Sequence, residues 1–157
     1  MPGRPIQLKP RLMALALRVP PGSCVADIGT DHARVPLYLL QQGITDRVIA
    51  TDVREGPLKM AAAALSRHGL LEKAVLRLGK GADCLEPDEA NCVIIAGMGG
   101  DTIADILIRS PWLREKRLLL QPQTHSERVL SVLEEWGKVP NTLEVREKGR
   151  TYIVIEC

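Results

Sequence analysis

The sequence predicts a single α/β domain built on a mostly parallel, doubly wound sheet. Short aliphatic runs alternate with segments of helical periodicity along the 157 residues, which is typical of parallel strands joined by crossover helices. Glycines and acidic residues follow directly after these runs, whereas the runs themselves are plainly aliphatic. In such sheets the ligand binds outside the carboxyl ends of the strands. The same pattern therefore predicts a binding site at that edge.

Composition narrows the class of protein. Hydrophobic residues at 45% and charged residues at 25% are typical of a globular domain. No apolar run approaches the roughly 20 residues of a membrane span, and the N-terminus lacks the apolar core of a signal peptide. The four cysteines have no metal-type pair spacing. We therefore expect a cytoplasmic protein with reduced thiols, no bound metal and no membrane partner. A net charge of +2 permits a nucleic-acid partner without demonstrating one.

The first predicted element is a helix at about residues 8–19. Leu8, Leu12, Leu15 and Val19 recur at helical spacing, and the prolines and glycine at 20–22 end the segment. The sheet and its helices then follow. Strands are expected at residues 23–29, 47–53, 74–79, 92–96 and 118–121, and helices at 35–42, 56–68 and 102–109, with a further helix after residue 124.

Two of the helices carry a capping-box pattern at their start. Thr102 with Asp105, and Thr124 with Glu127, have the spacing of the reciprocal side-chain caps found at helix N-termini. The tail has a different pattern, since residues 143–147 and 152–155 are two strand-like runs joined tightly. We expect a C-terminal antiparallel hairpin added to the parallel sheet, with helices on both faces.

The loop after the first strand decides between two nucleotide cofactors. It holds Asp27, Gly29 and Asp31, where a dinucleotide-binding loop would hold three glycines and no charge. Asp52 follows at the end of the second strand, where a carboxylate can accept hydrogen bonds from a ribose diol. A negative charge at Asp31 would repel a pyrophosphate. S-adenosylmethionine (SAM) carries no phosphate and is cationic, so the charges favour SAM over NAD.

Each of these residues also has a purely structural explanation. Asp31 could be only the N-cap of the following helix, and Asp52 could simply initiate a turn. Residues 97–100, Gly-Met-Gly-Gly, could be a tight turn into a helix, and His32 could be a structural hydrogen-bonding residue.

Several of these segments together resemble, in order and spacing, the bacterial TrmK family. The segments are Leu8-Lys9-Pro10-Arg11-Leu12, the loop from Asp27 to Ala33, Glu55-Gly56-Pro57, Gly79-Lys80-Gly81, Ile95-Ala96-Gly97-Met98-Gly99-Gly100 and Leu120-Gln121-Pro122. Members are Rossmann-like class I SAM-dependent methyltransferases that modify N1 of an adenine in the D-arm region of tRNA (adenine 22). The resemblance thus implies SAM as cofactor and tRNA as partner.

The sequence departs from the family pattern at a few positions. Arg34 stands where members usually have an aromatic residue, Lys80 where they have Asn or Asp, and Gln123 where they have Asn. The family pattern also continues into a C-terminal helical extension, which is absent after Cys157. We therefore expect residues 1–157 to be one methyltransferase domain, monomeric, that binds tRNA weakly without such an extension.

The resemblance implies a cofactor role for eight positions, all at predicted strand ends. Asp27 and Gly29 would line the methionine part of SAM, and Asp52 with Val53 would hold the ribose. Gly81 and Ala82 would border the adenine ring, and Ala96 and Gly97 would lie beside the methyl group.

The target base would be held by other residues. A carboxylate near the adenine N6 amine would stabilise the positive charge of the product, and Asp31 is assigned that catalytic role, with His32 and Gln121 as base-contacting neighbours. Arg11 is a clamp for either the cofactor carboxylate or a tRNA phosphate. Arg18, together with Arg34 and Arg54, is expected near the same edge.

Three other functions are compatible with these residues. The chain could methylate a small molecule or a protein, or it could be a non-catalytic SAM-binding module. An NAD-dependent dehydrogenase ranks last because of Asp31.

Overall fold

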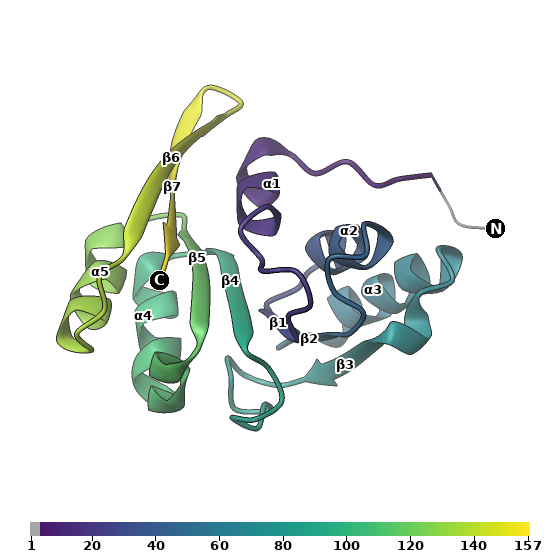
Figure 1. The fold of residues 1–157 in the computed structure, drawn as a ribbon, viewed down its shortest axis with the longest axis horizontal. Coiled ribbons are helices and arrows are strands. Elements are labelled where there is room, and N and C mark those ends of the chain that lie inside the picture. Colours follow the sequence, from purple (N-terminus) through teal and green to yellow (C-terminus); the bar gives the residue numbers. More distant parts are fainter. Residues whose placement is uncertain (1–3) are drawn as a thin grey trace.

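The computed structural model describes residues 4–157. Seven strands form one sheet in the order β3-β2-β1-β4-β5-β7-β6 (Figure 1). The strands are β1 (Val25–Ile28), β2 (Val48–Asp52), β3 (Ala74–Leu78), β4 (Cys92–Met98), β5 (Arg117–Pro122), β6 (Asn141–Glu147) and β7 (Arg150–Glu156). Strands β1 to β5 are parallel to their neighbours, and β7 is antiparallel to both β5 and β6. The predicted parallel sheet with a terminal hairpin is confirmed.

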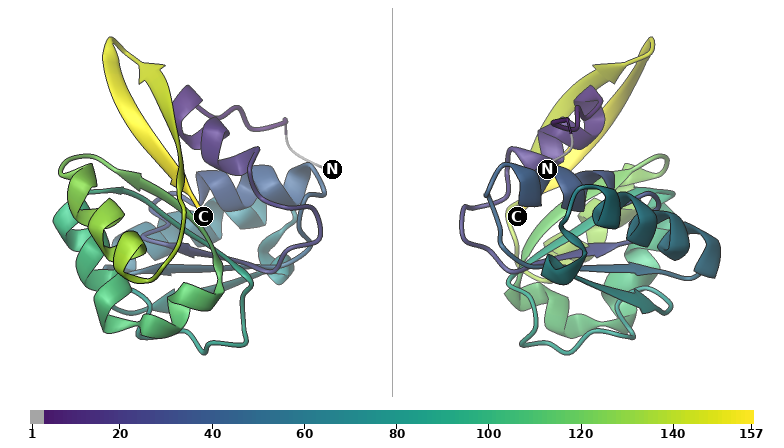
Figure 2. Two further views of the ribbon diagram at one scale, coloured as in Figure 1. Left: turned by 60° about the vertical axis from the view of Figure 1, so that its left-hand side comes forward. Right: turned by 90° about the vertical axis from the view of Figure 1, so that its right-hand side faces the viewer.

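Helices cover both faces of the sheet. They are α1 (Pro10–Ala16), α2 (Arg34–Gln41), α3 (Glu55–Arg67), α4 (Gly100–Arg109) and α5 (Ser126–Glu135), with 3₁₀ turns at Leu71–Lys73 and Pro111–Glu115. The right-hand view of Figure 2 shows α2 and α3 on one side of the sheet and α4 and α5 on the other. The doubly wound arrangement predicted from the sequence is therefore present.

Two hydrophobic cores result from this layering. Along β4, Val93 and Ile95 pack with α4 and α5, whereas Cys92 and Ile94 pack with α1, α2 and α3. All four are essentially inaccessible to solvent. Because both faces are covered, successive side chains of a central strand are all apolar, which is why the strands read as unbroken aliphatic runs.

Helix α1 is shorter than the predicted 8–19. It spans Pro10–Ala16, and the next residues form a tighter turn, in which the N–H groups of Arg18 and Val19 donate to the carbonyl oxygens of Leu15 and Ala16. This turn leads the chain into Pro20, so the apolar stripe extends beyond the regular helix.

Both predicted capping boxes are wrong. Helix α4 begins at Gly100 with Gly99 as its N-cap, and α5 begins at Ser126 with His125 as its N-cap, and neither has a side-chain cap. The two helix starts instead bond to each other through the backbone, since the Gly100 N–H donates to the Thr124 carbonyl at 2.7 Å. A tertiary contact has replaced the local cap.

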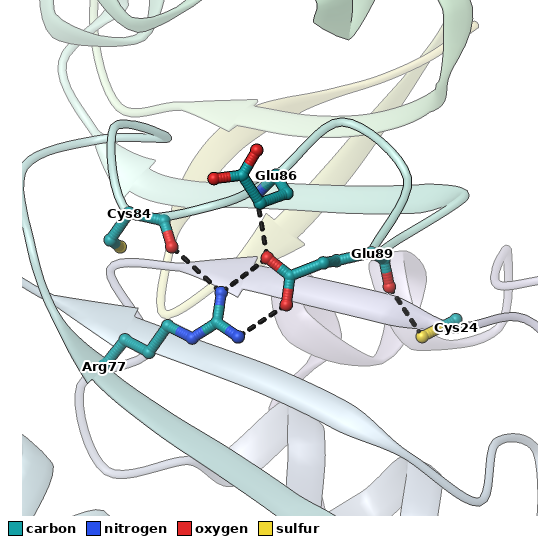
Figure 3. A network of polar contacts seen from close by, with 5 residues as sticks. All are labelled: Cys24, Arg77, Cys84, Glu86 and Glu89. Atoms are coloured by element: carbon teal, nitrogen blue, oxygen red, sulfur yellow. Dashed lines mark hydrogen bonds and ion pairs between the residues drawn. The ribbon is translucent and has the colours of Figure 1, made fainter.

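The connection from β3 to β4 lacks a crossover helix. Within residues 79–91, all of them described, turns run along the sheet face instead. Arg77 of β3 donates from Nη1 to the Cys84 carbonyl at 2.9 Å and to Oε1 of Glu89 at 2.7 Å (Figure 3). The Cys24 thiol lies 2.9 Å from the Glu89 carbonyl oxygen. These contacts hold the connection against the sheet and thereby position its first residues, Gly79 to Ala82, at the carboxyl edge.

The C-terminal hairpin projects beyond the carboxyl edge of the sheet. Strand β7 pairs with β5 only at Leu119↔Glu156 and Leu120↔Ile155, whereas β6 and β7 pair along their whole length. Because β7 is antiparallel to β5, its unpaired first part extends past the end of β5. Figures 1 and 2 show the hairpin standing away from the sheet with α1 packed beside it.

The close approach of the α4 and α5 starts gives a stability prediction. A Cβ added at Gly100 would overlap the carbonyl oxygens of Thr124 and His125. We expect Gly100→Ala to lower the free energy of unfolding by about 1–3 kcal/mol, because backbone cannot move aside as a side chain can. Urea denaturation measures this. The control is Gly56→Ala, where a Cβ meets nothing; equal effects of the two substitutions would contradict the prediction.

Candidate functional site

A cavity of about 940 Å³ opens at the carboxyl edge of the sheet. Its walls are residues 27–32, 51–54, 79–83 and 96–98, which follow four neighbouring strands, and Arg11 of α1. Its volume is in the range of small-molecule sites. All eight positions assigned to the cofactor line it, namely Asp27, Gly29, Asp52, Val53, Gly81, Ala82, Ala96 and Gly97. The cavity thus lies where the sequence predicts a binding site, and the binding role of each residue stays a prediction.

The loop after β1 has a backbone that few residues adopt. Gly29, Asp31 and Ala33 have φ values of +72°, +54° and +55°. The N–H groups of Gly29 and Thr30 both donate to the Thr51 carbonyl at 2.9 Å, which holds the loop against β2. Non-glycine residues in this conformation are uncommon and gather at functional sites. The loop is therefore a strained element held in place by the neighbouring strand.

Asp31 projects from this loop into the opening of the cavity. The N-cap of α2 is Ala33 and has no side-chain cap, so the explanation of Asp31 as a simple N-cap is wrong. Its side chain is 66% exposed, and its Oδ1 lies 3.7 Å from Nε2 of the equally open His32. A free carboxylate and an imidazole thus stand together at the cavity mouth.

Asp27 is a buried acid at the base of the same loop. Its side chain is almost fully inaccessible, and Thr30 donates a hydrogen bond to its Oδ2 at 2.9 Å. Burial raises the pKa of Asp27 to about 7, with smaller contributions from the charges of Asp52 and Asp31 and an opposing effect of the Thr30 hydrogen bond. A cationic group beside Asp27 would favour its ionised form.

Asp52 links the loops after β1 and β2. Its Oδ2 accepts the Asp31 N–H at 3.3 Å, and its Oδ1 accepts the Arg54 N–H at 3.1 Å. The second bond is the turn contact considered from the sequence, but the side chain also lines the cavity. Asp52 therefore has a structural role and a position suited to ligand binding. Val53 beside it is 61% exposed, unusual for an apolar side chain at a strand end.

Glycines let the backbone come close to the cavity from three sides. Gly97 has a φ of +76°, and Arg11 Nη1 lies 3.6 Å from where its Cβ would be. A Cβ on Gly29 would overlap the end of the Met98 side chain. Gly81, with a φ of +56°, packs against Ile106 next to the buried Ala82. Larger residues at these positions would obstruct the cavity or displace its walls.

Gln121 does not contact the cavity, contrary to its assignment beside the base. Its side chain is completely buried. Its Oε1 accepts Arg11 Nη1 at 2.7 Å and the Gly97 N–H at 3.2 Å, and its Nε2 donates to the Pro122 carbonyl at 3.0 Å. All three of these hydrogen bonds go to protein groups, so Gln121 positions Arg11 and Gly97 from behind.

Arg11 is held by the C-terminal hairpin as well as by Gln121. Its backbone N–H donates to Glu147 Oε1 at 3.0 Å, its Nε lies 3.8 Å from Glu147 Oε2, and its guanidinium lies 5.8 Å from the centre of the Tyr152 ring. Neither Glu147 nor Tyr152 was identified from the sequence. They are more than 130 residues from Arg11, and no local pattern pairs them with it.

The other predicted arginines divide into two groups. Arg34 and Arg54 line the cavity. Arg18 does not, because it donates to the Ala14 carbonyl at 2.8 Å and lies 3.9 Å from Glu156. The expectation for Arg18 is therefore wrong.

Among residues 4–157 there is no helix with the length and apolarity needed to cross a membrane. The same residues contain no group of three or more His, Cys, Asp or Glu side chains arranged to hold a metal ion.

The buried Asp27 gives a stability that depends on pH. Its pKa is about 7 in the folded protein against 3.8 without burial, so the folded state retains the proton and stability falls as pH rises across that interval. Asp27→Asn removes this loss and keeps an acceptor for Thr30. We expect Asp27→Asn to raise the free energy of unfolding by a few kcal/mol above pH 7. Below about pH 4 the substitution should leave the free energy of unfolding nearly unchanged.

Urea denaturation from pH 4 to pH 8 measures the effect. The control is Asp46→Asn, which changes an exposed aspartate. The same pH dependence in Asp27→Asn and in the unchanged protein would contradict the prediction.

The chain is similar to known proteins over most of its length. A family model described as a methyltransferase domain matches residues 8–155. The chain is 32% identical, over 96% of its length, to the tRNA (adenine(22)-N(1))-methyltransferase of Bacillus subtilis (strain 168), and it spans 64% of that curated relative.

Solved structures of tRNA methyltransferases are also similar to this chain. The crystal structure of the B. subtilis m1A22 tRNA methyltransferase TrmK is similar with a TM-score of 0.92 and 31% identity, covering 96% of this chain and 66% of that one. Streptococcus pneumoniae Sp1610, in complex with S-adenosyl-L-methionine, is similar with a TM-score of 0.88 and 32% identity, covering 99% of this chain and 72% of that one. Matched over nearly its whole length, the chain belongs to the methyltransferase domain family.

Proposed function

We propose that the chain transfers the methyl group of SAM to N1 of an adenine in tRNA. One observation carries this proposal: Asp27, Asp31 and Asp52 stand together on the wall of one cavity, as a cationic cofactor and a cationic product require. The printed functions of the B. subtilis relatives support it. Modification of tRNA would take place in the cytoplasm, and we expect the domain to be monomeric.

The cavity residues fit SAM group by group. The buried Asp27 would pair with the cofactor ammonium and become ionised by doing so. Asp52 would accept hydrogen bonds from the ribose hydroxyls, and Gly81 and Ala82 would border the adenine ring of the cofactor. When bound, SAM supplies an electrophilic methyl group on a cationic sulfur. Gly97, whose position leaves room where a side chain would stand, would lie beside that methyl group.

Arg11 would hold the cofactor carboxylate rather than a tRNA phosphate. Its side chain is only 18% exposed, and it lies deep in the cavity beside Gly97. A backbone phosphate would remain outside the cavity. The contacts with Gln121 and Glu147 fix the guanidinium in advance, which lowers the entropic cost of binding.

The target adenine would be activated by position and charge. Its N1 lone pair is free at neutral pH, so no general base is needed, and alignment with the methyl group supplies much of the rate. N1 lies on the pairing edge, so the base must be unpaired or flipped out to react. Asp31, exposed at the mouth, would accept a hydrogen bond from the N6 amine and stabilise the charge that develops on the ring. His32 would contact the same base.

The rival functions make different predictions about ligands. Calorimetry with SAM and with NAD, side by side, should give binding of SAM alone; binding of NAD alone would overturn the cofactor assignment. SAM binding without transfer to any acceptor would indicate a non-catalytic module. Transfer to a protein or small molecule but not to a tRNA transcript would refute the proposed substrate. The expected product is N1-methyladenosine, detected by mass spectrometry of digested tRNA.

Asp31 is the residue on which the mechanism depends. We expect Asp31→Ala to lower kcat by about a hundredfold and to leave SAM binding unchanged, because the side chain faces the mouth. Asp31→Asn, which tolerates the left-handed backbone, separates the lost charge from any local rearrangement. The control is Asp46→Ala, at an exposed position. Methylation by Asp31→Ala at the unchanged rate, with SAM binding intact, would refute the assignment.

A further inference from the structure

Three cationic side chains meet beside the cavity from distant parts of the chain. Lys9 immediately precedes α1, Arg34 is the first residue of α2, and Lys148 lies at the turn between β6 and β7. All three are exposed. Lys148 and Arg34 are both close enough to Lys9 to act on it by their charge. We refer to these three residues as the cation cluster.

Contacts next to the cluster hold it together. Arg11, two residues after Lys9, donates its backbone N–H to Glu147, which directly precedes Lys148. Lys148 itself has a φ of +50°, followed by Gly149 at +77°, so the turn has the form of a tight two-residue hairpin loop. The two lysines are therefore brought together by the backbone and by the Arg11–Glu147 contact, at the start of α1 and the end of β6.

The cluster is electrostatically unfavourable without an anion. Lys148, whose side chain lies close to that of Lys9, lowers the pKa of Lys9 by repulsion between like charges, and Arg34 adds to the repulsion. Glu147 acts in the opposite direction, but its carboxylate already bonds to Arg11. None of the ion pairs found within residues 4–157 involves Lys9, Arg34 or Lys148.

The position of the cluster indicates what the anion is. Arg34 lines the cavity, on the same wall as Asp31 and His32. The hairpin that carries Lys148 projects past the carboxyl edge of the sheet (Figure 1), and the cavity lies at the same edge. A nucleotide whose base reaches Asp31 would leave its sugar-phosphate backbone outside the mouth, next to the cluster. Exposed lysine and arginine side chains are the usual ligands of backbone phosphates.

We propose that Lys9, Arg34 and Lys148 bind a backbone phosphate of the RNA strand beside the adenine that enters the cavity. This inference rests on the proposed function, since it takes the substrate to be RNA. The hairpin and the start of α1 thus form one side of the RNA-binding surface, and the cluster sets the register of the strand over the cavity.

The test removes charge from the cluster without disturbing its backbone. The variant is Lys9→Gln with Lys148→Asn, because Asn suits the left-handed position in the turn. The control pair is Lys73→Gln with Arg114→Gln, which removes two positive charges before β3 and β5, at the opposite edge of the sheet. Binding of a tRNA transcript is measured over a range of salt concentrations, together with the Kd for SAM.

We expect the cluster variant to bind tRNA about tenfold more weakly at 0.1 M salt, with a salt slope smaller by about one unit. SAM binding should be unchanged, and Lys9→Arg with Lys148→Arg should restore tRNA binding. Equal losses in the control pair, or an unchanged affinity and slope in the cluster variant, would overturn the inference.

The same measurements separate this inference from the proposed function. If the cluster variant methylates tRNA as well as the unchanged chain does, the inference is refuted and the proposed function stands. If tRNA binding has a salt slope that depends on the cluster but no N1-methyladenosine forms, the inference stands and the proposed reaction is refuted. Absence of salt-dependent tRNA binding by the unchanged chain would overturn the inference directly.

Discussion

The covering of both faces of the parallel sheet is the constraint on which the other features depend. Successive side chains of β4 enter two different hydrophobic cores, so a central strand has no place for a polar group along its length. Polar residues can appear only where the strands end. That is why Asp27, Asp52 and the glycine-rich segments of the β3 and β4 ends meet at one edge, and why a cavity lined by both acidic and basic side chains forms there.

A second group of contacts joins this edge to the C-terminal hairpin. Arg11 connects α1 to Gln121 of β5 and to Glu147 of β6, and it lies against the Tyr152 ring of β7. The three aspartates of the cavity and the partly buried guanidinium of Arg11 are complementary to a ligand that carries both an ammonium and a carboxylate. Lys9 and Lys148 are exposed near this edge, and Arg34 is exposed on the cavity wall. Under the proposed function, the aspartates would face the cofactor and the target base, and the exposed cations would face the polyanion.

The sequence predicted the features that depend on neighbouring residues and failed at those that depend on distant ones. The sheet and the positions of Asp27 and Asp52 follow from strand-end patterns a few residues long. The capping box at Thr124 failed because its carbonyl bonds to Gly100 in another helix. Gln121 was misplaced because its partner Arg11 lies 110 residues away. The left-handed backbone at Asp31 is imposed by contacts with β2, which no local pattern reveals.

The separation of Arg11 from its partners also affects how the protein matures during synthesis. Gln121, Glu147 and Tyr152 all lie in the last quarter of the chain, so the residues that position Arg11 leave the ribosome last. Helix α1 can pack against α2 once both have emerged, but the Arg11 side chain still lacks these three partners when strands β1 to β4 are complete. The wall of the cavity formed by Arg11 is therefore assembled last. A ribosome stalled before the hairpin would display a nearly complete sheet with an unfinished binding site.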